Sequence, residues 1–467
     1  MEGKVTTSTN NQKASAGEVN IFAAKEISRY VRSTLGPMGL DKLLVDKAGD
    51  TVVTNDGATI LKRMDVTHPT ARMIIEVART QEEHCYDGTT SSIILTGELM
   101  KQAETLLSKK IHPNMIARGF KDASSKAEEL LDKLTIDVDQ DLLTTVAETA
   151  MTGKSAESDK GILAGICVEV AQATSLDNIS IIKRPGGKVS DSTAISGLLI
   201  DREKVHHGMP DVVENAKIAL IEVDVTLPEF ATQVQVRVDN NDAVEEFIAK
   251  RKAQLQTIAQ NIMATGANVV FCLRDIDPLV VEQLTKNGVY AARRVAKSDI
   301  ESISKATGAR IISAVDDLTT ADLGEAGLLE EVSVNESALI KLTKTPSSEA
   351  VSVLIRAPTQ HVVDEIARAF DDAVGVVSVA HNDGKVLAGG GSTFMNLSKS
   401  LKEYATTIGG RAQLAVEAFA NALEVIPATL AENSGLDPVD SMIELRRAHS
   451  ESSDDAIYYG VNVYDGG

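Results

Sequence analysis

Asp87-Gly88-Thr89-Thr90-Ser91 places a carboxylate, a glycine and three hydroxyls at the start of an apolar helix whose large residues recur at helical spacing as far as Leu106. The first turn of such a helix has free backbone N–H groups and the positive end of the helix dipole, so it attracts phosphate. A carboxylate just upstream is well placed to hold the Mg²⁺ that accompanies a nucleotide. In isolation, an ordinary turn with an N-capped helix explains the same residues, so the interpretation depends on the rest of the chain.

The composition indicates a folded chain with a large aliphatic core. The 467 residues include 43% hydrophobic residues and only 11 prolines, and the length suggests roughly three domains. Tryptophan is absent and aromatic residues make up 3%. Ala, Val, Ile and Leu must therefore fill the core, which suits long helices in close contact.

Charge and cysteine content exclude several classes of function. A net charge of −20 argues against a nucleic-acid partner, because phosphate backbones repel such a field. Three cysteines lie far apart, which predicts neither a disulfide framework nor a cysteine metal site and fits a cytoplasmic location. Residues 1–13 are polar rather than signal-like, and no apolar run approaches about 18 residues, so we expect no membrane segment.

The order of predicted elements suggests one domain inserted into another. Residues 51–54 and 58–61 are predicted to form two strands around the Asn55-Asp56-Gly57 turn. From residue 217 to 315 strands alternate with helices, which predicts a parallel or mixed sheet, with a further strand over 234–238 and a long charged helix over 243–264. Helices are predicted on both sides of this region, over 19–34, 70–83, 89–110, 113–134, 142–151, 161–173, 360–380, 392–407, 411–433 and 439–450. Strands are also expected over 179–183 and 194–201.

Four further features are compatible with nucleotide chemistry. The glycines of Leu35-Gly36-Pro37-Met38-Gly39 allow a ligand close to the backbone, although a helix C-cap followed by proline explains them equally. Asp56 at the tip of a rigid turn could reach a phosphate or its water. Asp372 lies opposite the apolar stripe of its helix, either as a solvated carboxylate or as a general base facing another domain. Gly389-Gly390-Gly391 precedes a helix, as in many phosphate sites. No GxxxxGK[ST] run is present, so the chain is not a P-loop NTPase.

These motifs, in this order, resemble the nucleotide motifs of the group II chaperonins, the family of the archaeal thermosome and its eukaryotic cytosolic relative. The matching segments are Ser33-Thr34-Leu35-Gly36-Pro37, residues 54–60, Asp87-Gly88-Thr89-Thr90-Ser91, Thr152-Gly153-Lys154, residues 368–374, Gly389-Gly390-Gly391, residues 430–437 and residues 460–463. The resemblance extends from Val19 to Gly467.

The resemblance implies an ATP-dependent chaperone that encloses non-native proteins in a double ring of about eight subunits per ring and closes on ATP hydrolysis. It implies a multidomain α and α/β chaperonin fold. A mostly helical equatorial ATP-binding domain would comprise residues 1–137 and 390–467, and a small α/β intermediate hinge domain residues 138–209 and 357–389. An inserted α/β apical substrate-binding domain would comprise residues 210–356, with a built-in helical lid over 227–264.

The resemblance also assigns roles to individual residues. Asp87 would ligate Mg²⁺. The Thr89, Thr90 and Ser91 hydroxyls and backbone, with Gly88, would hold the phosphates. Asp56 and Asp372 would orient or deprotonate the attacking water, and Lys154 would sense the terminal phosphate. The remaining nucleotide contacts would be Thr34, Leu35, Gly36, Pro37, Gly57 and Gly390.

The chain departs from the family pattern at three places. Tyr86 stands where family members usually have glycine, and Met38 replaces a usual lysine. The sequence ends at Gly467, where relatives continue through an acidic nucleotide contact, a long helix and a strand that pairs with neighbouring subunits. An ATPase is expected. The alternative is a non-catalytic or assembly-impaired relative acting as a binding or scaffold protein, whereas a metabolic phosphotransferase lacks a supporting small-substrate motif.

Overall fold

The structure is a computed structural model that describes residues 15–45, 49, 51–64, 66–153, 159–227, 241–334, 337–347, 350–451 and 454–464. The chain folds into two compact units: the first comprises residues 1–158 and 375–467, and the second residues 159–374. The second unit is thus inserted into the first, as the predicted order of elements suggests. The finer division into three domains stays a prediction, and the strand predicted over 234–238 lies outside the described residues.

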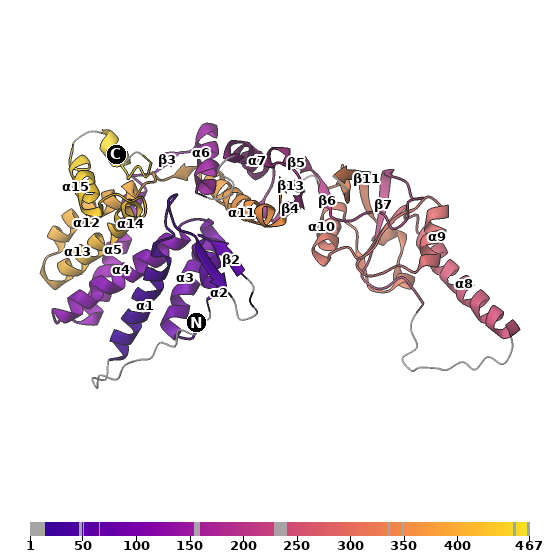
Figure 1. The fold of residues 1–467 in the computed structure, drawn as a ribbon, viewed down its shortest axis with the longest axis horizontal. Helices are drawn as coiled ribbons and strands as arrows, with labels where there is room; N and C mark the ends of the chain where they lie inside the picture. Colours follow the sequence, from indigo (N-terminus) through magenta and orange to yellow (C-terminus); the bar gives the residue numbers. More distant parts are fainter. Residues whose placement is uncertain are drawn as a thin grey trace. The chain divides into compact units, whose positions relative to one another are not determined.

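Close-packed helices form most of the first unit (Figure 1). The helix α4 contacts α1, α3 and α13, and α13 also packs against α5 and α12. Gly97 of α4 faces Ser28 of α1 so closely that a methyl group there would overlap the serine side chain, so glycine allows the two helices to approach. The helices are α1 (Ala16–Arg32), α2 (Gly57–Arg63), α3 (Pro69–Cys85), α4 (Thr89–Ser108), α5 (Pro113–Leu131), α6 (Gln140–Met151), α12 (Ser392–Ile408), α13 (Gly410–Leu423), α14 (Val425–Asn433) and α15 (Pro438–Ala448). Two short strands, β3 (Ile136–Asp137) and β14 (Lys385–Val386), pair antiparallel.

The predicted hairpin over residues 51–61 is wrong in its second half. The strand β2 (Thr51–Thr54) pairs with the preceding strand β1 (Lys42–Val45), and the residues after Asp56 form α2 instead of a strand. The Asp56 carboxylate caps this helix by accepting hydrogen bonds from the N–H groups of Ala58 (3.4 Å) and Thr59 (2.7 Å). Helix formation also buries Ile60 and Leu61 in the core shared with α1 and α4, and this tertiary burial outweighs the local turn signal.

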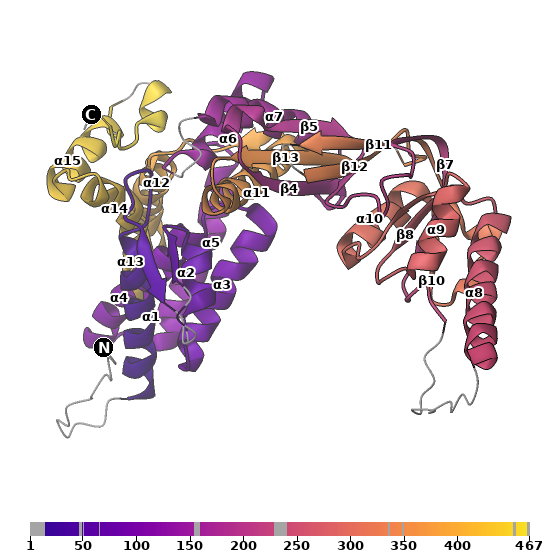
Figure 2. The ribbon, with the colours of Figure 1, turned by 45° about the vertical axis from the view of Figure 1, so that its right-hand side comes forward.

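The second unit is built on a seven-stranded mixed sheet with the order β6-β12-β11-β7-β8-β9, and β10 also pairs with β7. The strands β7, β8, β9 and β10 are parallel, whereas β11, β12 and β6 pair antiparallel. The helices α8 and α9 cover one face of the sheet and α10 the other, as the predicted alternation of strands and helices requires (Figure 2). Their bounds are β6 (Leu198–Ile200), β7 (Val212–Ile221), α8 (Asn241–Ala264), β8 (Val269–Cys272), α9 (Pro278–Lys286), β9 (Tyr290–Ala292), α10 (Lys297–Thr307), β10 (Ile311–Ile312), β11 (Gly324–Val334) and β12 (Ser337–Thr343).

A smaller sheet in the second unit has the order β4-β13-β5. The strand predicted over 194–201 is interrupted at Gly197, where φ is +117°, so its two halves join different sheets as β5 and β6. The remaining elements are α7 (Lys160–Ala173), β4 (Ile179–Pro185), β5 (Thr193–Ser196), β13 (Val351–Ala357) and α11 (Gln360–Asp383), with short 3₁₀ turns η2 (Leu176–Asn178), η3 (Val189–Asp191), η4 (Val315–Asp317), η5 (Thr320–Asp322) and, in the first unit, η6 (Asp454–Tyr458).

One stretch of the described chain, Gly410–Asn433, is long enough to cross a membrane and contains an 18-residue segment that is apolar enough by composition. It forms the two helices α13 and α14, and 67% of its most apolar window is buried inside the protein. Core helices of globular proteins meet the same criterion, so this stretch is weak evidence for a membrane span.

Candidate nucleotide site

The helix α4 begins at Thr89, as the sequence predicts. Its N-cap is Gly88, which has φ +76° and no side chain to cap the helix, so the amide groups of the first turn remain for an external acceptor. The Asp87 side chain is exposed, and the backbone carbonyl of Asp87 accepts a hydrogen bond from the Gln81 amide at 2.9 Å, which holds the loop on α3. This end of α4 therefore combines free donors with a carboxylate.

Tyr86 ends α3 in a left-handed conformation, with φ +56° and ψ 6°. Its N–H group donates to the Glu82 carbonyl at 3.0 Å, and its ring lies against the backbone of Gly375 in α11. Tyr86 thus stands at a left-handed position, which glycine, the residue usual in the family, would adopt without backbone strain.

The loop at residues 55–57 packs directly on the start of α4. A methyl group on Gly57 would overlap the side chain of Thr90, so only glycine permits this approach. Asn55 donates from Nδ2 to the Gly153 carbonyl at 3.1 Å, which connects this loop to the end of α6. Two predicted nucleotide motifs and the Thr152-Gly153 segment therefore lie together.

The loop at residues 34–37 joins the same group. A Cβ atom on Gly153 would lie 2.7 Å from the Pro37 carbonyl oxygen, so these backbones touch. Gly36 has φ +85°, and a Cβ atom there would lie 2.5 Å from Cδ2 of Leu430 in α14. Thr34 is buried, and its hydroxyl donates to the Val31 carbonyl at 2.8 Å.

Asn433 at the end of α14 is a residue whose role the sequence did not reveal. Its Nδ2 group donates to the carbonyls of Arg32 (3.1 Å) and Leu35 (2.9 Å), and thereby supplies partners at the C-terminal end of α1. The segment around Asn433 resembles a family motif, but the contact spans some 400 positions of the chain, so no local pattern could predict it.

The glycine loop at residues 389–391 also packs against α14. Gly391 has φ +82° and is the N-cap of α12, and a Cβ atom there would lie 2.7 Å from Cβ of Pro427. Gly390 accepts a hydrogen bond at its carbonyl from the Val461 N–H at 2.8 Å. We use the term loop cluster for residues 34–37, 55–57, 87–91, 152–153 and 389–391, which are connected through these contacts and α14.

Two predicted catalytic residues are not in the loop cluster. Lys154 lies outside the described residues. Asp372 belongs to the second unit, where its side chain on α11 is half-buried while the apolar stripe of that helix is buried. The stripe predicted for this helix is therefore confirmed, and the role of Asp372 stays a prediction.

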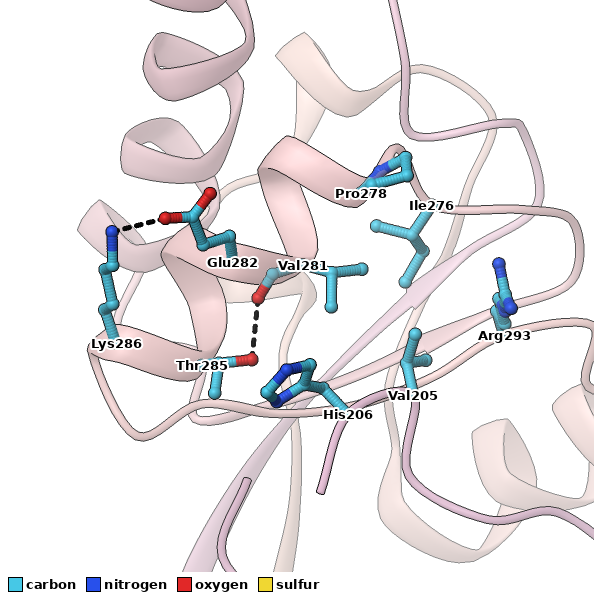
Figure 3. A pocket seen from close by; sticks show the side chains of 9 residues that line it. All are labelled: Val205, His206, Ile276, Pro278, Val281, Glu282, Thr285, Lys286 and Arg293. Atoms are coloured by element: carbon cyan, nitrogen blue, oxygen red, sulfur yellow. Dashed lines mark hydrogen bonds and ion pairs between the residues drawn. The ribbon is translucent and has the colours of Figure 1, made fainter. Parts of the chain in front are cut away.

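A cavity of about 460 Å³ lies in the second unit between α9 and the segment at Val205 and His206 (Figure 3). Val205, Ile276, Pro278 and Val281 contribute apolar side chains to its lining, and the lining residues Lys286 and Glu282 form an ion pair at 2.5 Å. Its lining residues are Val205, His206, Ile276, Pro278, Val281, Glu282, Thr285, Lys286 and Arg293. The cavity thus offers apolar surface with charges of both signs.

Comparison with known proteins identifies the family. The TCP-1/cpn60 chaperonin family model matches residues 27–467. The thermosome subunit beta of Methanothermobacter thermautotrophicus is 47% identical over 458 residues, covering 97% of this chain and 84% of the relative. A thermosome subunit of Methanopyrus kandleri is 46% identical over 464 residues, covering 97% and 85%. The solved open-state monomer of a group II chaperonin from Methanococcoides burtonii aligns with a TM-score of 0.64 and 42% identity, covering 82% of this chain and 91% of that one.

The chain therefore belongs to the TCP-1/cpn60 chaperonin family, and within it to the group II chaperonins. It has the multidomain α and α/β chaperonin fold. It is a subunit of an ATP-dependent chaperone with ATPase activity that acts on unfolded proteins in an oligomeric double-ring assembly.

Proposed function

We propose that this subunit binds Mg²⁺-ATP at the loop cluster and couples its hydrolysis to closing a chamber around a non-native protein. The observation that supports the proposal is a chain of close contacts that links five sequence-distant loops, one of which packs on the uncapped N-terminus of α4. These contacts involve glycines or backbone groups, so the main chains of the loops approach one another closely. Such loops can hold a ligand through main-chain groups.

In this proposal the start of α4 binds the phosphates through the amides and hydroxyls of Thr89, Thr90 and Ser91, with Gly88 providing the turn. Asp87 would hold Mg²⁺, which neutralises phosphate charge when bound. Among the described residues, no three His, Cys, Asp or Glu side chains gather into a metal cage. One exposed carboxylate suits Mg²⁺, which takes most of its ligands from phosphates and water. Nucleotide contacts are further assigned to Thr34, Leu35, Gly36, Pro37, Gly57 and Gly390.

The proposed hydrolytic residues are Asp56, Asp372 and Lys154. Because both Asp56 oxygens accept amide hydrogen bonds in α2, this carboxylate is better suited to orient water than to remove its proton. Asp372 is then the proposed general base, and Lys154 the proposed sensor of the terminal phosphate. The base comes from the second unit, so its approach to the nucleotide would link chemistry to movement between units.

We further propose the equatorial, intermediate and apical division at the boundaries given above, a lid over 227–264, and about eight subunits per ring in the cytoplasm. Exposed apolar side chains on the first unit, including Phe22, Leu43 and Met73, provide surface for neighbouring subunits. The three free thiols agree with a reducing compartment. The cavity beside α9 is the proposed contact for exposed apolar segments of a client protein (Figure 3).

Steady-state ATP hydrolysis tests the proposal. We expect Asp372→Ala to lower kcat by at least about 100-fold, the contribution typical of a general base. Asp364→Asn is the matched control: Asp364 also lies on α11, where it pairs with Lys183 at 3.1 Å, and its replacement should leave kcat within about twofold. Equal, slow hydrolysis by wild type and Asp372→Ala would refute the proposed base and favour the non-catalytic alternative.

A further inference from the structure

Tyr86 has a conformation that its side chain does not favour. A left-handed residue with a Cβ atom costs roughly 1–2 kcal/mol relative to glycine, and Tyr86 has φ +56° at the end of α3. Such a residue persists where surrounding contacts compensate for the strain. For Tyr86 the compensating contact is with Gly375, which also belongs to the first unit.

Gly375 is equally unusual in its own element. It is the only glycine in α11, and a glycine inside a helix costs about 1 kcal/mol relative to alanine. A methyl group at this position would overlap Cγ and Cδ1 of the Tyr86 ring, and would lie 2.7 Å from Cδ2. The ring therefore lies directly against the helix backbone at Gly375. Gly375 leaves space beside the helix backbone, and the Tyr86 ring fills that space. Each residue is unfavourable in its own element, but the two fit each other.

The contact joins two elements that carry proposed site residues. Asp87 follows Tyr86 directly in the chain, and Asp372 precedes Gly375 by three residues on α11. Residues three apart in a helix lie on neighbouring positions of one face. The Tyr86 ring thus packs on the part of α11 that belongs to the first unit, about one helical turn along the chain from the proposed base.

We propose that Tyr86 is a positioning residue for ATP hydrolysis, acting through its packing on Gly375 to set α11 against the Asp87 loop. The inference rests on the proposed function, because it uses the roles of Asp87 and Asp372. In this proposal the ring has no contact with the reacting atoms or with the phosphate-binding amides. Its loss should therefore lower kcat while leaving the KM for ATP nearly unchanged.

The experiment combines ATPase kinetics with thermal unfolding for Tyr86→Gly, Gly375→Ala and the double variant. We expect each single variant to lower kcat about ten- to hundredfold with KM within about twofold. The two single substitutions disrupt the same contact, so their effects should not add. The kcat of the double variant should therefore be no lower than that of the single variant with the lower kcat. Tyr86→Phe keeps the ring and should resemble wild type.

Lys110→Gly is the matched control for backbone strain. Lys110 is exposed beyond the end of α4 and also has a left-handed backbone, with φ +60°. Its replacement removes the same kind of strain without removing a ring contact, so kcat should not change.

The outcomes separate this inference from the proposed function. A wild-type kcat in Tyr86→Gly, with or without a lower melting temperature, overturns the inference, as does a change in KM alone. If Asp372→Ala abolishes hydrolysis in the same assay, the proposed base stands while Tyr86 is merely structural. If Asp372→Ala hydrolyses ATP as wild type does, the proposed role of Asp372 is refuted, and the inference about Tyr86 is refuted with it.

Discussion

Single side chains far along the chain hold the proposed nucleotide loops in place, and Asn433 is the clearest of them. Its amide donates hydrogen bonds to the carbonyls of Arg32, the last residue of α1, and of Leu35. Gly36 and Pro37 of the proposed nucleotide site follow Leu35 directly. Removing this amide is costly because the part-buried Leu35 carbonyl then loses this partner, whereas the Arg32 carbonyl keeps its hydrogen bond from the Leu35 N–H at 3.3 Å. The position of the loop therefore depends on a residue that need not touch the ligand.

We expect Asn433→Ala to lower the free energy of unfolding by about 1–3 kcal/mol and to weaken ATP binding. Thermal unfolding and nucleotide titration measure the two effects. Asn287→Ala is the control, because Asn287 also donates from Nδ2 to a helix carbonyl, that of Gln283 at 2.8 Å, but lies exposed in the second unit. ATP affinity that is unchanged in Asn433→Ala would contradict the positioning role.

At the scale of elements, Glu424 connects α12, α14 and α15. It immediately precedes α14, and it accepts hydrogen bonds from Ser398 (2.9 Å) and Lys402 (2.5 Å) of α12 and from Arg446 of α15. Burial alone would raise the pKa of Glu424, but the hydrogen bonds from Arg446, Lys402 and Ser398 outweigh burial and lower it below the ordinary value of 4.5. The charged form therefore stabilises the folded state.

The sign of this shift predicts acid sensitivity. Because the pKa of Glu424 is lower in the folded state, its contribution to stability is complete above about pH 4.5 and declines as the pH falls through the folded value. Because Lys402 and Arg446 are partly exposed, we expect Glu424→Gln to cost about 1–3 kcal/mol at neutral pH and to flatten the loss of stability below pH 4.5. Chemical denaturation across pH measures both, with Glu432→Gln, an exposed ion-pair partner of Arg32, as the control. A parallel pH profile in both variants would contradict the assignment.

Local signals predicted most elements but not the contacts between them. The start of α4 at Thr89 and the loop before α12 follow from glycine and hydroxyl patterns, and both predictions are confirmed. The strand predicted after Gly57 is wrong, because Ile60 and Leu61 find a helical environment that no local pattern encodes. The packing of Gly57 on Thr90 and the hydrogen bonds of Asn433 to the end of α1 arise from tertiary structure, so the sequence alone could not reveal them.

At the scale of the whole molecule, the reactivity of the three thiols can be used to follow the two units separately. Cys85 is half-buried next to Tyr86 in the first unit, whereas Cys167 and Cys272 are buried in the second. Burial raises the pKa of Cys167, and it raises that of Cys272 from 9.0 to about 11. The thiolate is the reactive form, so the two buried thiols should react slowly in the native protein.

We expect a thiol reagent at pH 8 to label Cys85 first, and MgATP to slow that labelling because the nucleotide would cover the adjacent Asp87 loop. The other two thiols should become reactive together, when denaturant unfolds the second unit. Cys85→Ser should remove the fast phase. A fast phase that persists in this variant would contradict the burial of Cys167 and Cys272, and labelling that is insensitive to MgATP would contradict the proposed site.

The dependence of the loop cluster on α14 has a consequence for biosynthesis. The loops at residues 34–37, 55–57 and 87–91 are translated before the second unit, but Leu430, Asn433 and Val461 are translated only after it. The whole second unit is synthesised in between and can fold in the meantime as a unit of its own. A nascent subunit would therefore complete the proposed nucleotide site only after its synthesis has passed Val461, so that the first loops wait for a partner made after the whole second unit.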